Sequence, residues 1–133
     1  MSTDIELHGN NKIEESIANF INNRTEEQLA DVLSSVRKQM REGASFVVAV
    51  EPSDSGMRFK EVVLKDGRTC GMVFTGFEEL MKGTKTISTF MVNMKQLFDA
   101  VLANNDSDGL IINAYGSSFL LDRQFIALII GRE

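Results

Sequence analysis

One stretch of the chain places polar side chains and its only tyrosine directly after a short apolar run. The run Leu110 to Ile112 predicts a buried strand, and Asn113, Tyr115, Gly116 and Ser117 follow it. Ligands often bind where the strands of an α/β sheet end, so these positions could bind a ligand or a partner. The alternative is a hairpin turn whose tyrosine covers an edge of the core, and turns of this composition are common. The candidate binding residues are Phe74, Thr75, Asn113, Tyr115, Gly116 and Ser117.

A reactive thiol is the second candidate for chemistry. Cys70 is the only cysteine, and the only histidine is His8, close to the N-terminus. A catalytic cysteine needs a neighbouring histidine or cation that lowers its pKa, and only Arg68 is close in sequence. A free cysteine in a strand more often packs as a small hydrophobic residue. We therefore expect no catalytic residue, and one cysteine with one histidine is too few for a zinc site.

Three further patterns fail on their spacing. A calcium loop that begins at Asp106 would need a glutamate at its twelfth position, which is Ser117. The adjacent Glu78 and Glu79 diverge on a helix, so they cannot act as an acid/base pair. No group of glycines has the spacing of a phosphate-binding loop. The sequence thus predicts no metal and no cofactor.

Composition and charge limit the classes of partner. The 133 residues suffice for one domain with a proper core. The net charge is −5 and basic residues are not bunched along the chain, which argues against a nucleic-acid partner and an anionic membrane surface. The longest apolar run, Phe125 to Ile130, is far shorter than the ~20 residues of a membrane span. No secretory signal is visible, so we expect a cytoplasmic protein.

The apolar periodicity predicts a single domain of the α+β (mixed α/β) class. Residues 1–9 are expected to form a flexible N-terminus, and residues 10–133 the domain. Within it, residues 10–43 predict a hairpin of two amphipathic helices that ends at Gly43. Residues 44–133 predict a mixed sheet that packs with three further short helices.

Three apolar strand patterns lead directly into a helix. The run Met72 to Phe74 meets Thr75, which we expect to cap the next helix in a capping box with Glu78. Asn93 and Asp122 are expected to cap the two later helices. In the third helix, the side chains expected to face inward are Phe77, Leu80 and Met81. In the last helix they are Phe125, Leu128 and Ile129.

The earlier part of the sheet is predicted from β-branched residues and turn signals. The first strand is expected over residues 46–50, and residues 51–56, which include Pro52, are expected to form a loop. A second strand over residues 59–65 should meet its partner across a hairpin turn at Asp66 and Gly67.

Several of these stretches resemble a known family. D-G-R at 66–68, M-V-F-T at 72–75 and E-E-L at 78–80 resemble the signature of the N-terminal domain of the SseB family, which is named for enhanced serine sensitivity. D-G-L-I-I-N at 108–113 resembles a later strand of that family, although Ala114 stands where the family commonly has proline. The resemblance implies a single-domain member with a mixed sheet, and it implies no reaction.

The sequence supports three hypotheses of function from different classes. The leading one is a non-catalytic protein-interaction or assembly module, acting through an exposed sheet edge or the outer face of the helical hairpin. Its partner would be a protein, with a second copy of the chain as one candidate. The second is a small-ligand sensor with Asn113, Tyr115, Phe74 and Thr75 near its pocket. The third is an enzyme that uses Cys70.

Overall fold

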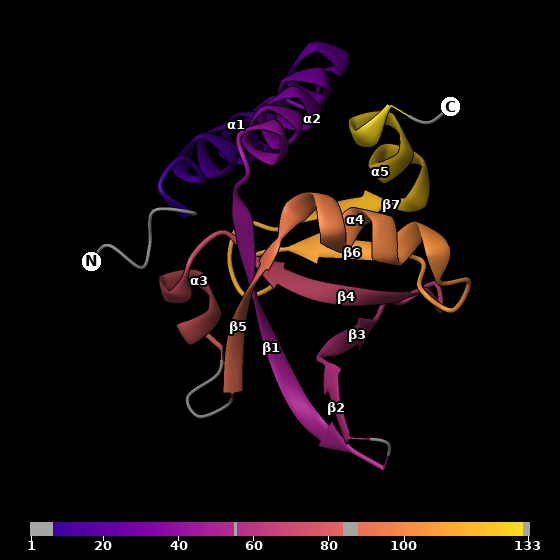
Figure 1. Ribbon diagram of the computed structural model, residues 1–133. Coiled ribbons are helices and arrows are strands. Elements are labelled where there is room, and N and C mark those ends of the chain that lie inside the picture. Colours follow the sequence, from indigo (N-terminus) through magenta and orange to yellow (C-terminus); the bar gives the residue numbers. More distant parts are fainter. Residues whose placement is uncertain (1–6, 55, 84–87, 132–133) are drawn as a thin grey trace.

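The computed structural model describes residues 7–54, 56–83 and 88–131 (Figure 1). Within these ranges, five helices and one mixed sheet of seven strands confirm the α+β class. The elements are α1 (Asn11–Asn22), α2 (Glu26–Arg41), β1 (Ser45–Ser53), β2 (Gly56–Phe59), β3 (Glu61–Val63), β4 (Thr69–Phe74), α3 (Phe77–Met81), β5 (Ser88–Asn93), α4 (Met94–Ala103), β6 (Gly109–Ile112), β7 (Phe119–Asp122) and α5 (Arg123–Ile130).

The predicted N-terminal helical hairpin is confirmed. Thr25 Oγ1 accepts from Gln28 N at 3.1 Å and so caps α2, and Gly43 follows that helix in the left-handed conformation (φ 84°). The hydroxyl groups of Ser16 and Ser35 lie 2.6 Å apart and join the two helices. Both helices contribute to the core through the side chains of Ile13, Ile17, Val32, Val36 and Met40.

β1 is the strand from which the rest of the sheet extends. Along one edge it pairs antiparallel with β5, and along the other it pairs with β4 at Val47 and Val48 only. Beyond that point β1 pairs with β2, while β3 pairs with β4. Lys60 lies between β2 and β3, donates from its N–H to Ala49 O (2.8 Å), and accepts from Met72 N (3.1 Å). The segment expected as one strand over 59–65 thus changes partner at Lys60.

The second half of the sheet contains its only parallel pair among the described strands. β4 and β6 run parallel, with Val73 opposite Ile112, and β7 closes this side antiparallel to β6. The carboxyl ends of β4 and β6 therefore lie next to each other.

The two faces of the sheet are covered unequally. The large core lies between the sheet and α1, α2, α4 and α5, and it includes the edge-to-face pair Phe46 and Phe98 with ring centroids 6.2 Å apart. The small core on the other face contains Val47, Met72 and Phe74 with Leu80 of α3. The far ends of β1 and β2 project beyond the helices at the bottom of the view in Figure 1.

Pro52 lies within β1, so the loop predicted over residues 51–56 is too long: residues 51–53 belong to β1, and Gly56 begins β2. Pro52 pairs with Met57 of β2, and the last pair between β1 and β5 is Val50 with Ser88. Pro52 is therefore beyond the end of β5, where one edge of β1 has no described neighbour. A proline can occupy such a position because no ladder hydrogen bond to its missing N–H is required.

The predicted inward faces of α3 and α5 are partly wrong. Leu128 is 46% exposed, whereas Ile126 and Ile129 are buried. Every residue from Phe125 to Ile130 is apolar, so periodicity alone cannot identify the buried face of α5. In α3, Leu80 is buried while Phe77 and Met81 are 38% and 55% exposed. Of the three, only Leu80 packs into the small core.

Candidate functional site

The ends of the parallel strands bring Thr75 and Asn113 together. Thr75 N donates to Asn113 Oδ1 at 2.9 Å, and Asn113 Nδ2 donates to Thr75 Oγ1 at 3.0 Å. Both residues are buried, and Asn113 has a left-handed backbone (φ 55°) that asparagine tolerates better than most residues. Each residue thus supplies the other with hydrogen-bond partners.

Thr75 does not cap α3, so the predicted capping box with Glu78 is wrong. The N-cap of α3 is Gly76, which makes no side-chain hydrogen bond to the helix. The Thr75 hydroxyl instead donates to Glu14 Oε2 of α1 at 2.5 Å. A cap would need Thr75 Oγ1 to accept from an amide of α3, but this oxygen accepts from Asn113 Nδ2 instead. The bonds to Asn113 and Glu14 thus direct the hydroxyl away from the helix.

Asn10 fastens the start of α1 to the sheet. Its Nδ2 donates to Ser45 O at 2.9 Å and to Thr75 O at 3.1 Å, and the residue is only 1% exposed. Asn10 N also donates to Leu7 O, which closes a turn that packs on the small core through Leu7. Residues 1–6 of the expected flexible N-terminus lie outside the described residues. The sequence marks Asn10 as part of a turn and as a possible start of the first helix, but no motif indicates its bonds to Ser45 and Thr75.

Tyr115 covers the small core, as the hairpin-turn interpretation of this stretch implies. Its ring stacks on Phe74 with centroids 5.4 Å apart and 29° between the planes. A side chain at Gly83 would come within 2.4 Å of the Tyr115 ring, so the ring lies directly on that glycine. Gly116 N donates to Asn113 O at 3.0 Å, and Ser117 is exposed.

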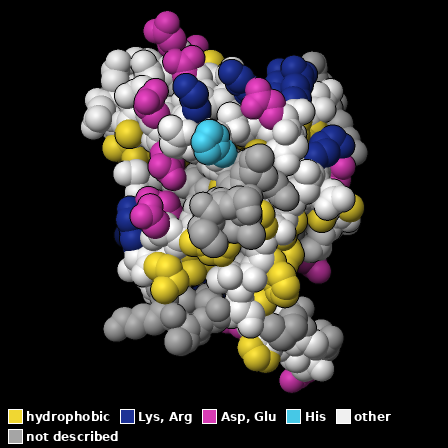
Figure 2. Space-filling view, turned by 60° about the vertical axis from the view of Figure 1, so that its left-hand side comes forward, with side chains coloured by type: hydrophobic (Ala, Val, Ile, Leu, Met, Phe, Trp, Pro, Cys, Tyr) yellow, Lys and Arg dark blue, Asp and Glu magenta, His cyan; other side chains and the backbone are white. Residues whose placement is uncertain are grey.

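An acidic cavity of about 390 Å³ adjoins this cluster, and Thr75 is the one candidate binding residue that lines it. It lies between the turn before α1, the first turn of α1 and the first turn of α3. Glu14, Glu78, Glu79 and His8 are among its lining residues. In Figure 2, where histidine is cyan, acidic side chains lie beside the histidine on this face of the molecule. We call this pocket the acidic cavity.

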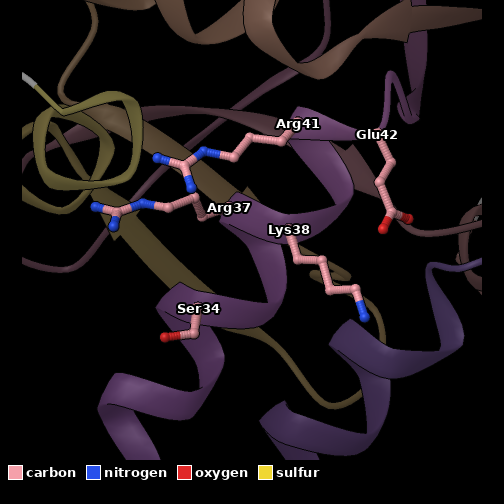
Figure 3. A pocket seen from close by; sticks show the side chains of 5 residues that line it. All are labelled: Ser34, Arg37, Lys38, Arg41 and Glu42. Atoms are coloured by element: carbon pink, nitrogen blue, oxygen red, sulfur yellow. The ribbon is translucent and has the colours of Figure 1, made fainter.

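A second pocket, of about 320 Å³, is lined by basic side chains of α2 (Figure 3). Ser34, Arg37, Lys38 and Arg41 have the spacing i, i+3, i+4, i+7 and share one side of the helix, and Glu42 completes the lining. The expectation that basic residues are not bunched is therefore wrong in three dimensions. Figure 3 shows the two arginines extending toward α5. Arg37 Nε donates to Ile129 O at 3.0 Å and its guanidinium also binds Leu128 O, so it stabilises the end of α5.

Cys70 is fully buried in β4. Burial raises the pKa of its thiol above the ordinary value, although the Arg68 guanidinium acts in the opposite direction. Arg68 is itself paired with Asp66, with Nε and Oδ2 2.8 Å apart. The protonated thiol is a poor nucleophile.

Asp108 has a structural role at the start of β6. Its Oδ2 accepts from Thr69 N at 2.8 Å and its N–H donates to Thr69 O at 2.9 Å, so both groups bind β4. In the part of the chain that the structure describes, no three His, Cys, Asp or Glu side chains are grouped as a metal site would require. No helix within the same ranges has the length and apolar character needed to cross a bilayer.

The comparisons with known proteins agree with the architecture. Residues 13–128 match the family described as the SseB protein N-terminal domain. Neither the curated proteins nor the solved structures gave a significant match. Because the matched residues include nearly the whole sheet and its covering helices, this chain belongs to the SseB family, through its N-terminal domain.

Proposed function

We propose that this domain is a non-catalytic protein-interaction module that binds an extended protein segment along the outer edge of β5. The observation that supports this is the composition of that edge. Within residues 7–54, 56–83 and 88–131, β5 pairs with β1 alone. Its six residues, Ser88–Asn93, include no charge and no proline. Natural sheet edges usually carry charges, prolines or bulges that prevent another strand from pairing.

The backbone of β5 alternates between its neighbour and its outer side. Met94, directly after the strand, donates from its N–H to Ala44 O at 3.0 Å. In an antiparallel ladder every second residue bonds to the neighbouring strand. Phe90 therefore bonds to β1, whereas Thr89 and Met91 direct their N–H and C=O groups outward. An added strand would find donors and acceptors at those two positions.

Exposed apolar side chains lie on β5 and on β2, the strands on either side of β1. Phe90, opposite Val48, and Phe59, opposite Val50, lie on the same face of the sheet and are 55% and 43% exposed. Figure 2 shows hydrophobic side chains in the lower half of its view and most charged ones in the upper half. The described ranges contain seven exposed large apolar side chains, and five of them lie on β2, β3, α3 and β5. These five are Phe59, Val63, Phe77, Met81 and Phe90.

Two other hypotheses are weaker. Burial and a raised pKa keep the Cys70 thiol protonated, which counts against an enzyme that uses it. A small-ligand sensor built on Asn113 and Tyr115 would need polar groups that already bind other parts of the protein. A free buried thiol also suits the reducing cytoplasm, where we propose the protein acts.

The test is selection of binding peptides from a random library, followed by affinity measurement by fluorescence anisotropy. We expect apolar peptides that bind in extended form. Thr89→Pro removes one outward N–H and should weaken binding about fivefold, the equivalent of one hydrogen bond of about 1 kcal/mol. Phe90→Ser should weaken binding about tenfold, because the half-buried ring supplies apolar contact worth about 1–1.5 kcal/mol.

The matched control is Leu128→Ser, which removes another exposed apolar side chain but lies on α5. It should leave peptide affinity unchanged. Sedimentation velocity shows whether a second copy is the occupant, since a dimer through β5 would dissociate in the Phe90→Ser variant. Absence of both peptide binding and self-association, or equal binding by all three variants, would refute the proposal.

A further inference from the structure

We propose that a pocket beside β7 binds a small molecule that carries an aromatic ring and a carboxylate. The pocket has a volume of about 270 Å³, and its lining includes Phe20 of α1, Phe119 of β7 and Phe125 of α5. We call it the aromatic pocket. In Figure 1 the helical hairpin and α5, which form its walls with β7, lie above that strand. Because β1, β4 and β6 separate β7 from β5, this site is distinct from the proposed protein interaction.

The three rings of the aromatic pocket contact one another in geometries that aromatic groups prefer. Phe20 meets Phe119 edge to face with centroids 5.7 Å apart, and Phe119 stacks on Phe125 with centroids 6.2 Å apart. Phe20 and Phe125 pack on the large core but are only half-buried. Ile21, which also lines the pocket, is 37% exposed. A ligand ring in the pocket would cover these apolar surfaces and extend the aromatic cluster.

Arg24 is the one cation among the described residues that line the aromatic pocket. Its guanidinium carbon lies 5.2 Å from the centroid of the Phe20 ring, so a cation–π contact keeps the charge at the pocket. Glu26 and Glu27 follow at the start of α2, yet none of the ion pairs between described residues involves Arg24. A ring attracts the charge of a guanidinium but cannot satisfy its five N–H donors. A carboxylate can, through two parallel hydrogen bonds.

Asp122, the acidic residue of the lining, already has a structural role. Its Oδ1 accepts from Phe125 N at 2.9 Å as the N-cap of α5. The partial positive charge of that helix terminus stabilises the Asp122 carboxylate and opposes the binding of a ligand ammonium beside it. Arg24 belongs to a different wall, the turn between α1 and α2. The carboxylate of the ligand therefore binds at Arg24, and its ring packs against the phenylalanines.

The basic pocket of α2 offers a carboxylate more positive charge but no apolar wall. The residues described in its lining include no apolar side chain. Arg37, one of its arginines, already uses Nε and Nη2 to bind the carbonyl oxygens of Ile129 and Leu128. A ligand with both a ring and a carboxylate thus fits the aromatic pocket better, and Arg41 of the basic pocket supplies a control.

An NMR titration of the backbone amides with phenylpropionate tests this assignment. We expect saturable shifts at the end of α1, in β7 and at the start of α5. Acetate lacks the ring and phenylpropanol lacks the charge, so each should bind about tenfold more weakly. Arg24→Gln should weaken binding of phenylpropionate about tenfold or more, as expected when a charged hydrogen bond becomes neutral. Asp122→Asn keeps a side chain that caps helices well and should not weaken binding.

Arg41→Gln is the matched control, because it removes the same charge from the same helical hairpin but outside the aromatic pocket. It should bind phenylpropionate like the wild type, and unfolding curves verify that each variant is folded. No saturable shifts at millimolar phenylpropionate would overturn the proposal. Unchanged affinity in Arg24→Gln, equal affinity for phenylpropylamine, or shifts along α2 that Arg41→Gln abolishes would overturn it as well. None of these outcomes bears on peptide binding at β5, so the two proposals fail independently.

Discussion

Replacing Asn113 tests whether the contact between the ends of β4 and β6 is as important as its geometry implies. In Asn113→Ala, the buried Thr75 N–H loses its acceptor at 2.9 Å, and Thr75 Oγ1 loses the donor at 3.0 Å. Alanine must also adopt the left-handed backbone that Asn113 has, with φ at 55°. Three separate penalties therefore act at one position.

Their sum is a large share of the stability of a domain. A buried N–H without an acceptor costs about 1–3 kcal/mol, and the second hydrogen bond is worth about 1 kcal/mol. The left-handed conformation costs alanine about 1 kcal/mol more than asparagine. We expect Asn113→Ala to lower the free energy of unfolding by about 3–5 kcal/mol. Asn113→Gly loses the same bonds without the backbone penalty, and should be less destabilised by about 1 kcal/mol.

Urea unfolding followed by circular dichroism measures these differences, with Asn105→Ala in an exposed turn as the control. The control should change stability by less than about 0.5 kcal/mol. A loss below about 1 kcal/mol in Asn113→Ala would show that Thr75 finds another acceptor, and would contradict the inferred importance of the pair. Equal stability of the alanine and glycine variants would contradict the backbone contribution.

Three further perturbations follow from burial and backbone geometry. Ile126→Ala should lower the free energy of unfolding by about 2–5 kcal/mol, whereas Leu128→Ala should cost less than about 1 kcal/mol, and urea unfolding would reveal a reversed order. Gly109→Ala should lower the free energy of unfolding by more than about 2 kcal/mol, because the new Cβ would lie 2.4 Å from Leu121 O and alanine would have to adopt a φ of 145°. An unchanged stability would mean that β6 and β7 can separate locally. Because the pKa of Cys70 is raised in the folded protein, the thiol holds its proton more tightly there, and stability should fall as the pH rises above 9.0. Unfolding at neutral and alkaline pH should show this loss in the wild type, and Cys70→Ala should reduce it.

The features that the sequence predicted well depend on neighbours in the chain. Asn93 Oδ1 accepts from Gln96 N at 3.1 Å and Asp122 Oδ1 from Phe125 N at 2.9 Å, so both predicted caps are confirmed. A cap requires only a side chain and an amide three residues later. Thr75 has the same local pattern but does not cap α3, because its hydroxyl binds Asn113, 38 residues away, and Glu14, 61 residues away.

The parts that could not be predicted depend on distant segments. The guanidinium group of Arg123 donates to carbonyl oxygens at the end of α4 and in the turn that follows it, at distances of 2.8–2.9 Å. No sequence motif predicts these hydrogen bonds. The acidic cavity likewise joins the start of α1 to the end of β4 through tertiary contacts. The basic pocket differs, because Arg37, Lys38 and Arg41 lie on a recognisable helix and their spacing could have been noticed.

The change of partner at Lys60 determines where the chain can gain or lose residues. Because its N–H binds Ala49 O and its C=O binds Met72 N, the segment from β2 to β3 fills the gap where β1 and β4 diverge. Deleting one residue between Gly56 and Val63 would shift the register of one pairing and turn its side chains to the opposite face. This apparent connecting segment must therefore keep its length as strictly as a core strand. Insertions would be tolerated only at its two turns, after Ser53 and around Asp66.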